Sequence, residues 1–314
     1  MNLYRLRCFF GYGSPSDSER KETFSKGNEN TMDERISYIS SRQNPLIVAC
    51  GKYRDKKYRD RDKVFLFEGR KLFNEALISG LQFSRIFVTE DALKRYMPLF
   101  LDAEKQQKHF PISVCTDAVY AKISCENSPE GILCLAKYID KSIKSTTIYM
   151  GSTPECVKGE RFLICDGLRD PGNLGAILRT AAAFGWRRIV LSDDCADVYH
   201  WKTVRASMGG LFRLSVDLAG NLVSYIDSLK VRGYRVYAAD AVPGATRIQE
   251  LGERSAGIGI VVGNEGHGIR EAVAKRCCGA VSIPMPGGME SLNAAVAASL
   301  FMWELTREDA HGSA

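Results

Sequence analysis

Three glycine-bearing segments in the second half of the chain carry the polar side chains that could do chemistry. The first, residues 166–185, follows an apolar run and opens a helix; it holds Asn173 in its turn and Arg179 in an otherwise apolar helical stretch. Such a turn is typical of phosphate and nucleotide binding, because a helix N-terminus presents free backbone N–H groups. Charged side chains are rarely buried without a partner, so Arg179 is either a functional group or a surface residue of an amphipathic helix.

The same turn also suggests a dinucleotide-binding fold. Two carboxylates, Asp193 and Asp194, lie about twenty positions beyond it, as such a fold requires. The turn, however, has only Gly172 and Gly175 in a G-x-x-G spacing and lacks G-x-G-x-x-G, which makes the evidence weak. A nicotinamide-dependent oxidoreductase is therefore a hypothesis that rests on this turn alone, and absence of NAD binding would exclude it.

The second segment, residues 262–269 (VGNEGHGI), comes directly after the most apolar run of the chain. Ligands bind at the carboxyl ends of parallel strands, and three glycines would let the backbone approach a ligand closely. Glu265 would then be a carboxylate at this edge of the sheet; alternatively, it caps a helix that begins near Ile269. His267 has no partner in the pattern, so we interpret it as part of the turn.

The third segment, residues 283–293 (IPMPGGMESLN), leads into an alanine-rich helix. Two prolines restrict the loop, and Gly287 and Gly288 allow tight contact with a ligand. Ser291 is either the N-cap of the helix or a ligand-contacting hydroxyl, and Asn293 is expected in the first turn with its amide free. The helix is almost free of charge, so we expect it to be buried on nearly every side.

These segments need a scaffold that brings their loops to one edge. From residue 161 onward, apolar runs alternate with helical patterns, and near-continuous runs indicate strands buried on both faces, hence a mostly parallel sheet. The expected strands are residues 162–165, 188–191, 211–216, 234–238, 258–262 and 280–283. The expected helices are residues 174–184, 222–232, 269–275 and 291–305.

The chain is long enough for two domains. Residues 32–138 are expected to form a small α/β/α domain, and residues 161–308 a larger α/β domain, joined by a Ser/Thr/Lys-rich linker at 139–160. Residues 1–31 have no helix or strand period and are expected to be disordered; they are an extension, a targeting peptide or a mis-assigned start before Met32. In the smaller domain we expect strands at residues 64–67, 85–89, 112–115 and 131–136, and a helix at 70–78.

Positive charge is concentrated between Lys52 and Lys63, where seven Lys or Arg side chains and two tyrosines occur with three Asp. Clustered cations with aromatic neighbours suit the phosphate backbone and unstacked bases of a nucleic acid. A solvated helix face with i,i+4 ion pairs, such as Asp55 with Arg59, explains the same pattern equally well. The candidate nucleic-acid-binding residues, which become RNA-binding residues under the family resemblance described below, are Arg42, Lys52, Arg54, Lys56, Lys57, Arg59, Arg61 and Arg70.

Composition excludes several classes of protein. The 314 residues carry a net charge of +6, and the longest stretch without a charged residue, 291–303, is too short to cross a bilayer. The ten cysteines form no C-x-x-C pair and the four histidines are scattered, so we expect no metal site. Reduced thiols, and with them a cytoplasmic location, are the expectation.

The three segments, read in order as NLGAILRTAAAFG, GNEGHGI and IPMPGGMESLNAAVAASLFMWEL, resemble the ordered motifs of the SpoU (TrmH-like) family of SPOUT RNA methyltransferases. The run SRQNPLIVACGKYRDKKYRDRDKVFLFEGRKLFNEAL resembles the ribosomal-protein-like RNA-binding domain that precedes the catalytic domain in many members. The resemblance covers nearly everything after Met32. It departs modestly at Asn264 and at Ala294-Ala295.

The resemblance implies an α/β fold with a deep trefoil knot, in which S-adenosylmethionine binds bent and is held largely by main-chain groups. Carried over to this chain, the cofactor contacts are Gly263, Ile283 and Leu292, with Gly287 and Gly288 nearby. It also implies a homodimer whose active site lies close to the subunit interface.

The implied reaction is transfer of a methyl group to a ribose 2′-hydroxyl of RNA. The implied catalytic set is Asn173, Arg179, Glu265, Ser291 and Asn293. The family assigns Arg179 the base role, but a guanidinium with a pKa above about 12 suits phosphate binding and electrostatic help better. Ribosomal RNA is the favoured substrate; transfer RNA, or a non-catalytic RNA-binding assembly factor with the same fold, is the alternative. The sequence does not identify the nucleotide.

Overall fold

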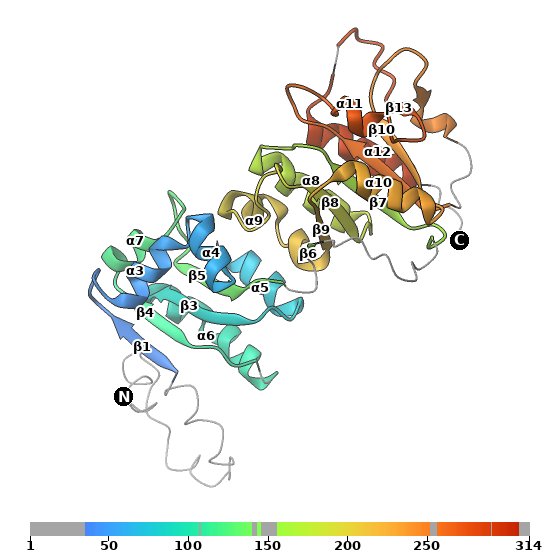
Figure 1. The fold of residues 1–314 in the computed structure, drawn as a ribbon. Coiled ribbons are helices and arrows are strands. Elements are labelled where there is room, and N and C mark those ends of the chain that lie inside the picture. The colour runs from blue at the N-terminus through green and yellow to red at the C-terminus, as the bar shows by residue number, and fades with distance from the viewer. Residues whose placement is uncertain are drawn as a thin grey trace, which may run out of the picture. The chain divides into compact units, whose positions relative to one another are not determined.

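The computed structural model describes residues 35–106, 108–139, 143–145, 156–251, 256–289 and 291–307. The chain divides into two units, residues 1–138 and residues 139–314, each with its own sheet (Figure 1). The expectation for residues 1–31 lies outside the described residues.

The first unit is built on a five-stranded sheet with the order β1-β4-β3-β5-β2. Strands β1, β4 and β3 run parallel, whereas β5 is antiparallel to both β3 and β2. Four of the strands were predicted; β1 was not, because it is short and half exposed. The bounds are β1 Ile36–Ile39, β2 Val64–Glu68, β3 Phe83–Thr89, β4 Ile112–Cys115 and β5 Ile132–Lys137.

In the described part of this unit, five helices accompany the sheet. The predicted helix at residues 70–78 is confirmed, and its apolar positions Leu72, Phe73, Ala76 and Leu77 are buried. Phe73 also makes edge-on ring contacts within a phenylalanine cluster that fills the core on this side. The bounds are α3 Pro45–Lys52, α4 Lys56–Asp62, α5 Arg70–Ile78, α6 Glu90–Lys105 and α7 Asp117–Ile123.

The second unit contains an eight-stranded sheet in which every pairing is parallel, with the order β11-β13-β10-β12-β7-β8-β9-β6. All five residues of β12 are buried, so side chains cover both faces of the sheet, as the continuous apolar run predicts. The bounds are β6 Ile143–Ser145, β7 Arg161–Cys165, β8 Arg188–Ser192, β9 Ser215–Ala219, β10 Arg235–Ala239, β11 Thr246–Arg247, β12 Ile258–Val262 and β13 Ala280–Ser282.

The helices of this unit pack along the sheet (Figure 1). Helix α10 shares an apolar core with β7, β8, β10 and β12, and α12 packs against α8 and β12. The bounds are α8 Pro171–Ala183, α9 Trp201–Ser207, α10 Leu222–Val231, α11 Glu271–Ala274 and α12 Ala294–Thr306, with 3₁₀ turns at Gly210–Arg213 and Ile248–Glu250.

One predicted strand begins too early, and some elements were not predicted. Residues 211–213 belong to a 3₁₀ turn and not to a strand, because Met208 and Gly209 both adopt positive φ and turn the chain before β9. Helix α9 was not predicted. Strand β6, which lies within the expected linker and pairs with β9 at the edge of the sheet, was not predicted either.

Helix α8 packs closely against α9, and Gly175 is the reason that it can. A Cβ at position 175 would lie 2.6 Å from the carbonyl oxygen of Thr203 and 2.5 Å from the Cβ of Ala206. Glycine is therefore needed here for helix packing, whereas the G-x-x-G spacing had suggested a nucleotide-binding turn.

Helix α12 buries only part of its surface within one chain. Ala295, Ala298, Phe301, Met302 and Leu305 are buried. Three other apolar side chains, at spacings of four and three residues, stay exposed: Val296 by 48%, Leu300 by 39% and Trp303 by 53%. The expectation of burial on nearly every side is therefore wrong for the single chain, and one apolar face of α12 is uncovered.

Charged and phenolic side chains near the amino ends of β7, β8, β9 and β10 form a network. Arg188 donates to Asp217 at 2.9 Å, Tyr225 donates to the same carboxylate at 2.8 Å, and Arg188 lies 3.6 Å from Glu160. Tyr234 donates to Glu160 as well. Burial raises the pKa of Tyr225, so its phenol stays protonated. The network closes this end of the sheet.

Candidate active site

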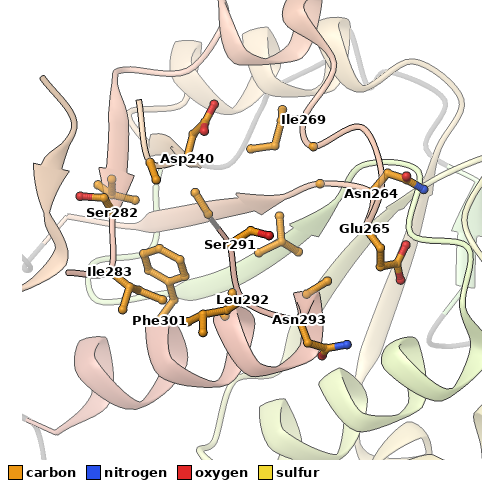
Figure 2. A pocket seen from close by; sticks show the side chains of 18 of the residues that line it. Asp240, Asn264, Glu265, Ile269, Ser282, Ile283, Ser291, Leu292, Asn293 and Phe301 are labelled. Carbon is orange, nitrogen blue, oxygen red and sulfur yellow. The ribbon is translucent and has the colours of Figure 1, made fainter. Parts of the chain in front are cut away.

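A pocket of about 450 Å³ lies at the carboxyl ends of three neighbouring strands, β10, β12 and β13 (Figure 2). Parallel sheets bind ligands at this edge. The loop after each strand forms one wall, and the start of α12 closes the pocket with Ala297 and Phe301. A volume of this size suits a cofactor-sized molecule.

The residues inferred as cofactor contacts divide into two groups. Gly263, Ile283 and Leu292 line the pocket. Gly287 and Gly288 do not; they lie in an exposed turn, where Gly288 has a φ of +73° and its N–H points to the Met285 carbonyl. The positive φ explains why residue 288 is glycine.

The loop after β12 closes on itself, which explains the glycine at its start. The backbone N–H and C=O of Asn264 pair with the C=O and N–H of Gly268, both at 2.9 Å. A Cβ at Gly263 would lie 2.2 Å from the carbonyl carbon of Gly268, a distance that no side chain allows. The backbone of Gly263 consequently forms the pocket wall directly.

A chain of hydrogen bonds joins all three segments at the mouth of this pocket. Asn173 donates through Nδ2 to Glu265 Oε1 at 2.8 Å, and Asn293 donates through Nδ2 to Asn173 Oδ1 at 3.1 Å. Glu265 and Asn293 both line the pocket (Figure 2). Glu265 therefore faces the site and is held by an amide.

Asn173 and Asn293 are each held by a helix start. Helix α8 begins at Pro171 because Asp170 is its N-cap, and Asp170 Oδ1 accepts from the Asn173 N–H at 2.7 Å. Asn293 is itself the N-cap of α12, and its Oδ1 accepts from Ala295 N and Val296 N. Of the two alternatives for Ser291, helix N-cap or ligand-contacting hydroxyl, the first is wrong, because the N-cap is Asn293, two residues later.

Ser291 and Arg179 remain available for a ligand. Ser291 lines the pocket (Figure 2), and its hydroxyl makes no hydrogen bond within the described ranges. Arg179 is exposed on α8, six residues and therefore about 9 Å along the helix axis from Asn173. It does not line the pocket, and it forms no ion pair with any residue that the structure describes.

A second polar network, which was not predicted, joins the loops that follow β7, β8 and β12. The carboxylate of Asp166, fully buried after β7, accepts from Arg270 N at 2.8 Å and from Arg270 Nε at 2.6 Å. Arg270 also lies 3.7 Å from Asp194. A hydrogen bond from Ser192 lowers the pKa of Asp194, which therefore stays ionised.

Asn264 ties the same two loops together. Its Nδ2 donates to the Gly167 carbonyl at 2.7 Å, and the Gly167 N–H donates to Ser192 Oγ at 2.8 Å. The loops that carry Asn173 and Glu265 are thus cross-linked behind the pocket. The available signal was that Asp166, Ser192 and Asn264 each follow the end of a predicted strand.

The wall formed by the loop after β10 was also missed. Ala239, Asp240 and Ala241 line the pocket and place a second carboxylate on it, opposite the loop that carries Glu265 (Figure 2). This loop follows a predicted strand, but periodicity does not give strand order. The sequence therefore contained no sign that β10 lies between β12 and β13.

The basic stretch of the first unit is less open than its composition suggests. Arg59 is only 2% exposed, and its guanidinium donates to the carbonyls of Tyr53 and Arg54 at 2.8 and 2.7 Å. A buried arginine that satisfies backbone carbonyls cannot contact a phosphate. Arg59 is therefore removed from the candidate RNA contacts.

Several other cations of the set have internal partners. Lys56 pairs with Asp60 at 2.7 Å, and Arg61 pairs with Asp62 at 2.6 Å. Arg42 and Arg54 donate to backbone carbonyls of the helix α7 region. The solvated, ion-paired alternative thus describes much of this stretch. Lys52, Lys57 and Arg70 are exposed without a carboxylate partner in the described part of the chain.

Two negative findings hold for the residues that the structure describes. They include no group of three or more His, Cys, Asp or Glu side chains arranged to hold a metal ion. Nor do they include a helix that is long and apolar enough to span a membrane.

Comparison with protein families matches both units. Residues 160–303 match the SpoU rRNA Methylase family, and residues 44–134 match the MRM3-like substrate binding domain. The first range contains every lining residue of the pocket, and the second contains the basic stretch.

Individual relatives match over nearly their whole length. The chain is 30% identical to the 23S rRNA (guanosine(2553)-2′-O)-methyltransferase RlmP of Bacillus subtilis (strain 168), over 86% of this chain and 99% of the relative. The AdoMet-bound rRNA methyltransferase from Sinorhizobium meliloti is structurally similar, with a TM-score of 0.74, 25% identity, and coverage of 87% of this chain and 98% of that one. An RNA 2′-O ribose methyltransferase gives a TM-score of 0.69 at 29% identity, covering 87% and 99%.

Proposed function

The chain belongs to the SpoU rRNA methylase family, and on this premise we propose that it methylates a ribose 2′-hydroxyl of RNA with S-adenosylmethionine. The observation that carries the proposal is the hydrogen-bonded chain Asn293–Asn173–Glu265 at the mouth of the pocket. It joins the three segments whose motifs match the family, and it leaves polar groups facing a cavity.

The pocket fits S-adenosylmethionine on its own chemistry. Gly263 brings backbone to the wall without a side chain, and Ile283 and Leu292 offer apolar surface for a purine ring. Asp240 and Glu265 place two carboxylates on the walls, which suits a ligand that carries cationic sulfonium and ammonium groups. These five residues are the proposed cofactor contacts.

Bound S-adenosylmethionine supplies a methyl group attached to a sulfonium, and transfer of this methyl group leaves a neutral thioether. The protein therefore has to orient the 2′-hydroxyl and ease its proton away. We assign Arg179 to the phosphate next to the target ribose, because an unpaired guanidinium forms bidentate contacts with phosphate. Glu265, Ser291 and Asn293 are placed to receive or orient the hydroxyl, and Asn173 holds Glu265 and Asn293 in position.

Ribosomal RNA is the proposed substrate, ahead of transfer RNA. The support is the name of the Bacillus subtilis relative and the match of the first unit to a substrate-binding domain. A location in the cytoplasm follows from the same proposal. It agrees with the described cysteines, none of which forms a disulfide.

We further propose a homodimer in which the exposed face of α12 is buried. Val296, Leu300 and Trp303 form an apolar stripe on the uncovered face of α12, which a second copy would bury. Val296→Glu should shift the protein to a monomer in light scattering, whereas an unchanged mass would remove α12 from the interface.

The trefoil knot typical of the family is proposed for the segment after β10, where β13 lies beside β10 and α12 returns to α8.

The decisive experiment maps 2′-O-methylation across total RNA from cells with and without the gene. Loss of methylation at a single nucleotide would identify the substrate. Unchanged methylation everywhere, together with S-adenosylmethionine binding by calorimetry, would favour the non-catalytic assembly factor. Absence of both would reject the proposed function altogether.

A further inference from the structure

A second hollow lies in the first unit, and no residue of the Lys52–Lys63 stretch lines it. It has a volume of about 460 Å³ and is lined by Arg70, Lys71 and Asn74 of α5, by Arg95 and Tyr96 of α6, and by Glu130. We call it the α5–α6 groove. It gathers three cations from two helices that are distant in sequence, so no single basic run in the sequence reveals it.

The cations of the α5–α6 groove are less neutralised than those of the basic stretch. Arg70, Lys71 and Arg95 are exposed, and none of them forms an ion pair with a residue that the structure describes. In the basic stretch, by contrast, Lys56 and Arg61 pair with carboxylates and Arg59 is buried. An unpaired cation attracts a phosphate more strongly than one that must first leave a carboxylate.

The one carboxylate of the groove is already engaged. Glu130 Oε2 accepts from the Arg70 backbone N–H at 2.9 Å and from the Tyr96 hydroxyl at 3.3 Å. Arg95 lies with its guanidinium carbon 5.8 Å from the centre of the Tyr96 ring, a cation–π distance. Glu130 therefore caps α5 and hydrogen-bonds Tyr96. These contacts fix the positions of the helices that carry Arg70 and Arg95.

We propose that the α5–α6 groove binds the phosphate backbone of the substrate RNA and contributes more to RNA affinity than the Lys52–Lys63 stretch. The inference rests on the proposed function, since it assumes an RNA substrate. Two arginines can each hold one phosphate in a bidentate manner, and Lys71 adds a third positive charge.

The test compares two variants of the full-length protein that each lose two positive charges. Arg70→Gln/Arg95→Gln removes the arginines of the groove, and Lys56→Gln/Arg61→Gln is the matched control in the basic stretch. Binding of a short fluorescein-labelled single-stranded RNA of mixed sequence is followed by anisotropy at several salt concentrations. The groove variant should bind roughly tenfold more weakly. Its salt slope should fall by about 1.4, since each single-strand phosphate contact contributes about 0.7.

The control variant should change the affinity less than about twofold, as exposed paired charges do. An equal or larger loss in the control would overturn the inference. A second measurement uses the wild-type protein and therefore does not depend on the folding of a variant. Bound RNA should protect Lys71 from amine acetylation. Equal labelling of Lys71 with and without RNA would contradict RNA binding in the α5–α6 groove. If the wild-type protein binds neither this RNA nor S-adenosylmethionine, the proposed function fails instead.

Discussion

The two ends of the parallel sheet in the second unit use polar side chains in opposite ways. At the amino end, Arg188 and Asp217 are largely buried and share hydrogen bonds with Tyr225. At the carboxyl end, Glu265 and Asn293 are linked by amides but still face a pocket. A network that stabilises uses up its hydrogen-bonding capacity, whereas a network that serves chemistry keeps part of it for the ligand.

The largest expected effect separates two exposed arginines of the second unit, Arg179 on α8 and Arg187 just before β8. Arg179→Ala should reduce turnover by about a hundredfold or more, because it removes the group assigned to the substrate phosphate, and it should leave S-adenosylmethionine affinity within about twofold. Arg187→Ala, which removes an exposed arginine just before β8, is the matched control and should leave turnover unchanged. Methyl transfer to RNA and cofactor calorimetry measure the two quantities. Full turnover in Arg179→Ala would remove this arginine from the mechanism.

Breaking the amino-end network should affect stability instead of chemistry. Arg188→Met leaves the Asp217 carboxylate without its cation, and we expect the free energy of unfolding to fall by about 2 to 3 kcal/mol, somewhat below the cost for a fully buried pair. Urea titration measures this change. Turnover per folded molecule should be retained. A loss of turnover without a loss of stability would contradict the assignment of the amino-end network to stability alone.

The amide chain at the carboxyl end should show coupling between its members. Asn173→Ala and Asn293→Ala should each lower turnover roughly tenfold, since each frees a group that positions Glu265 or the 2′-hydroxyl. The double variant should lose less than the product of the two, because the two amides hydrogen-bond to each other. Strictly multiplicative losses would mean that the 3.1 Å contact does not position the site.

The smallest effect distinguishes the two ends by pH. The pKa of Asp194 is lowered by the Ser192 hydrogen bond, so its contribution to stability is present above the unfolded value of about 3.9 and is lost as pH falls below it. The pKa of Tyr225 is raised by burial, so its contribution is present below about 10 and is lost as pH rises above that value. Unfolding curves of Asp194→Asn and Tyr225→Phe against wild type should therefore converge in acid and in alkali, respectively. Convergence in the opposite windows would refute both assignments.

The sequence predicts much of this architecture because periodicity reports burial. The five apolar residues of β12 predict a strand covered on both faces, and the spacing in α5 predicts its buried side. Parallel strands end at one edge, so loops that follow different strands could be expected to meet. Glu265, Ser291 and Asn293 all line one pocket for this reason.

What the sequence could not predict depends on tertiary position. Strand order is not periodic, so the wall at Asp240 was missed. Arg59 looks like its basic neighbours but satisfies two carbonyls in the interior. In the sequence, the uncovered face of α12 has the same apolar pattern as a helix face buried in the core. Apolar residues give this pattern whether their own chain or a second copy covers them.

Asn293 gives one amide two separate tasks. Its oxygen caps α12, and its nitrogen holds Asn173. Replacement by Asp would keep the oxygen that caps the helix but would remove the only donor in the side chain. Selection for a stable protein would therefore accept that change, and selection for an active one would reject it. A screen that ranks variants of this chain by melting temperature would pass over one of its most sensitive positions.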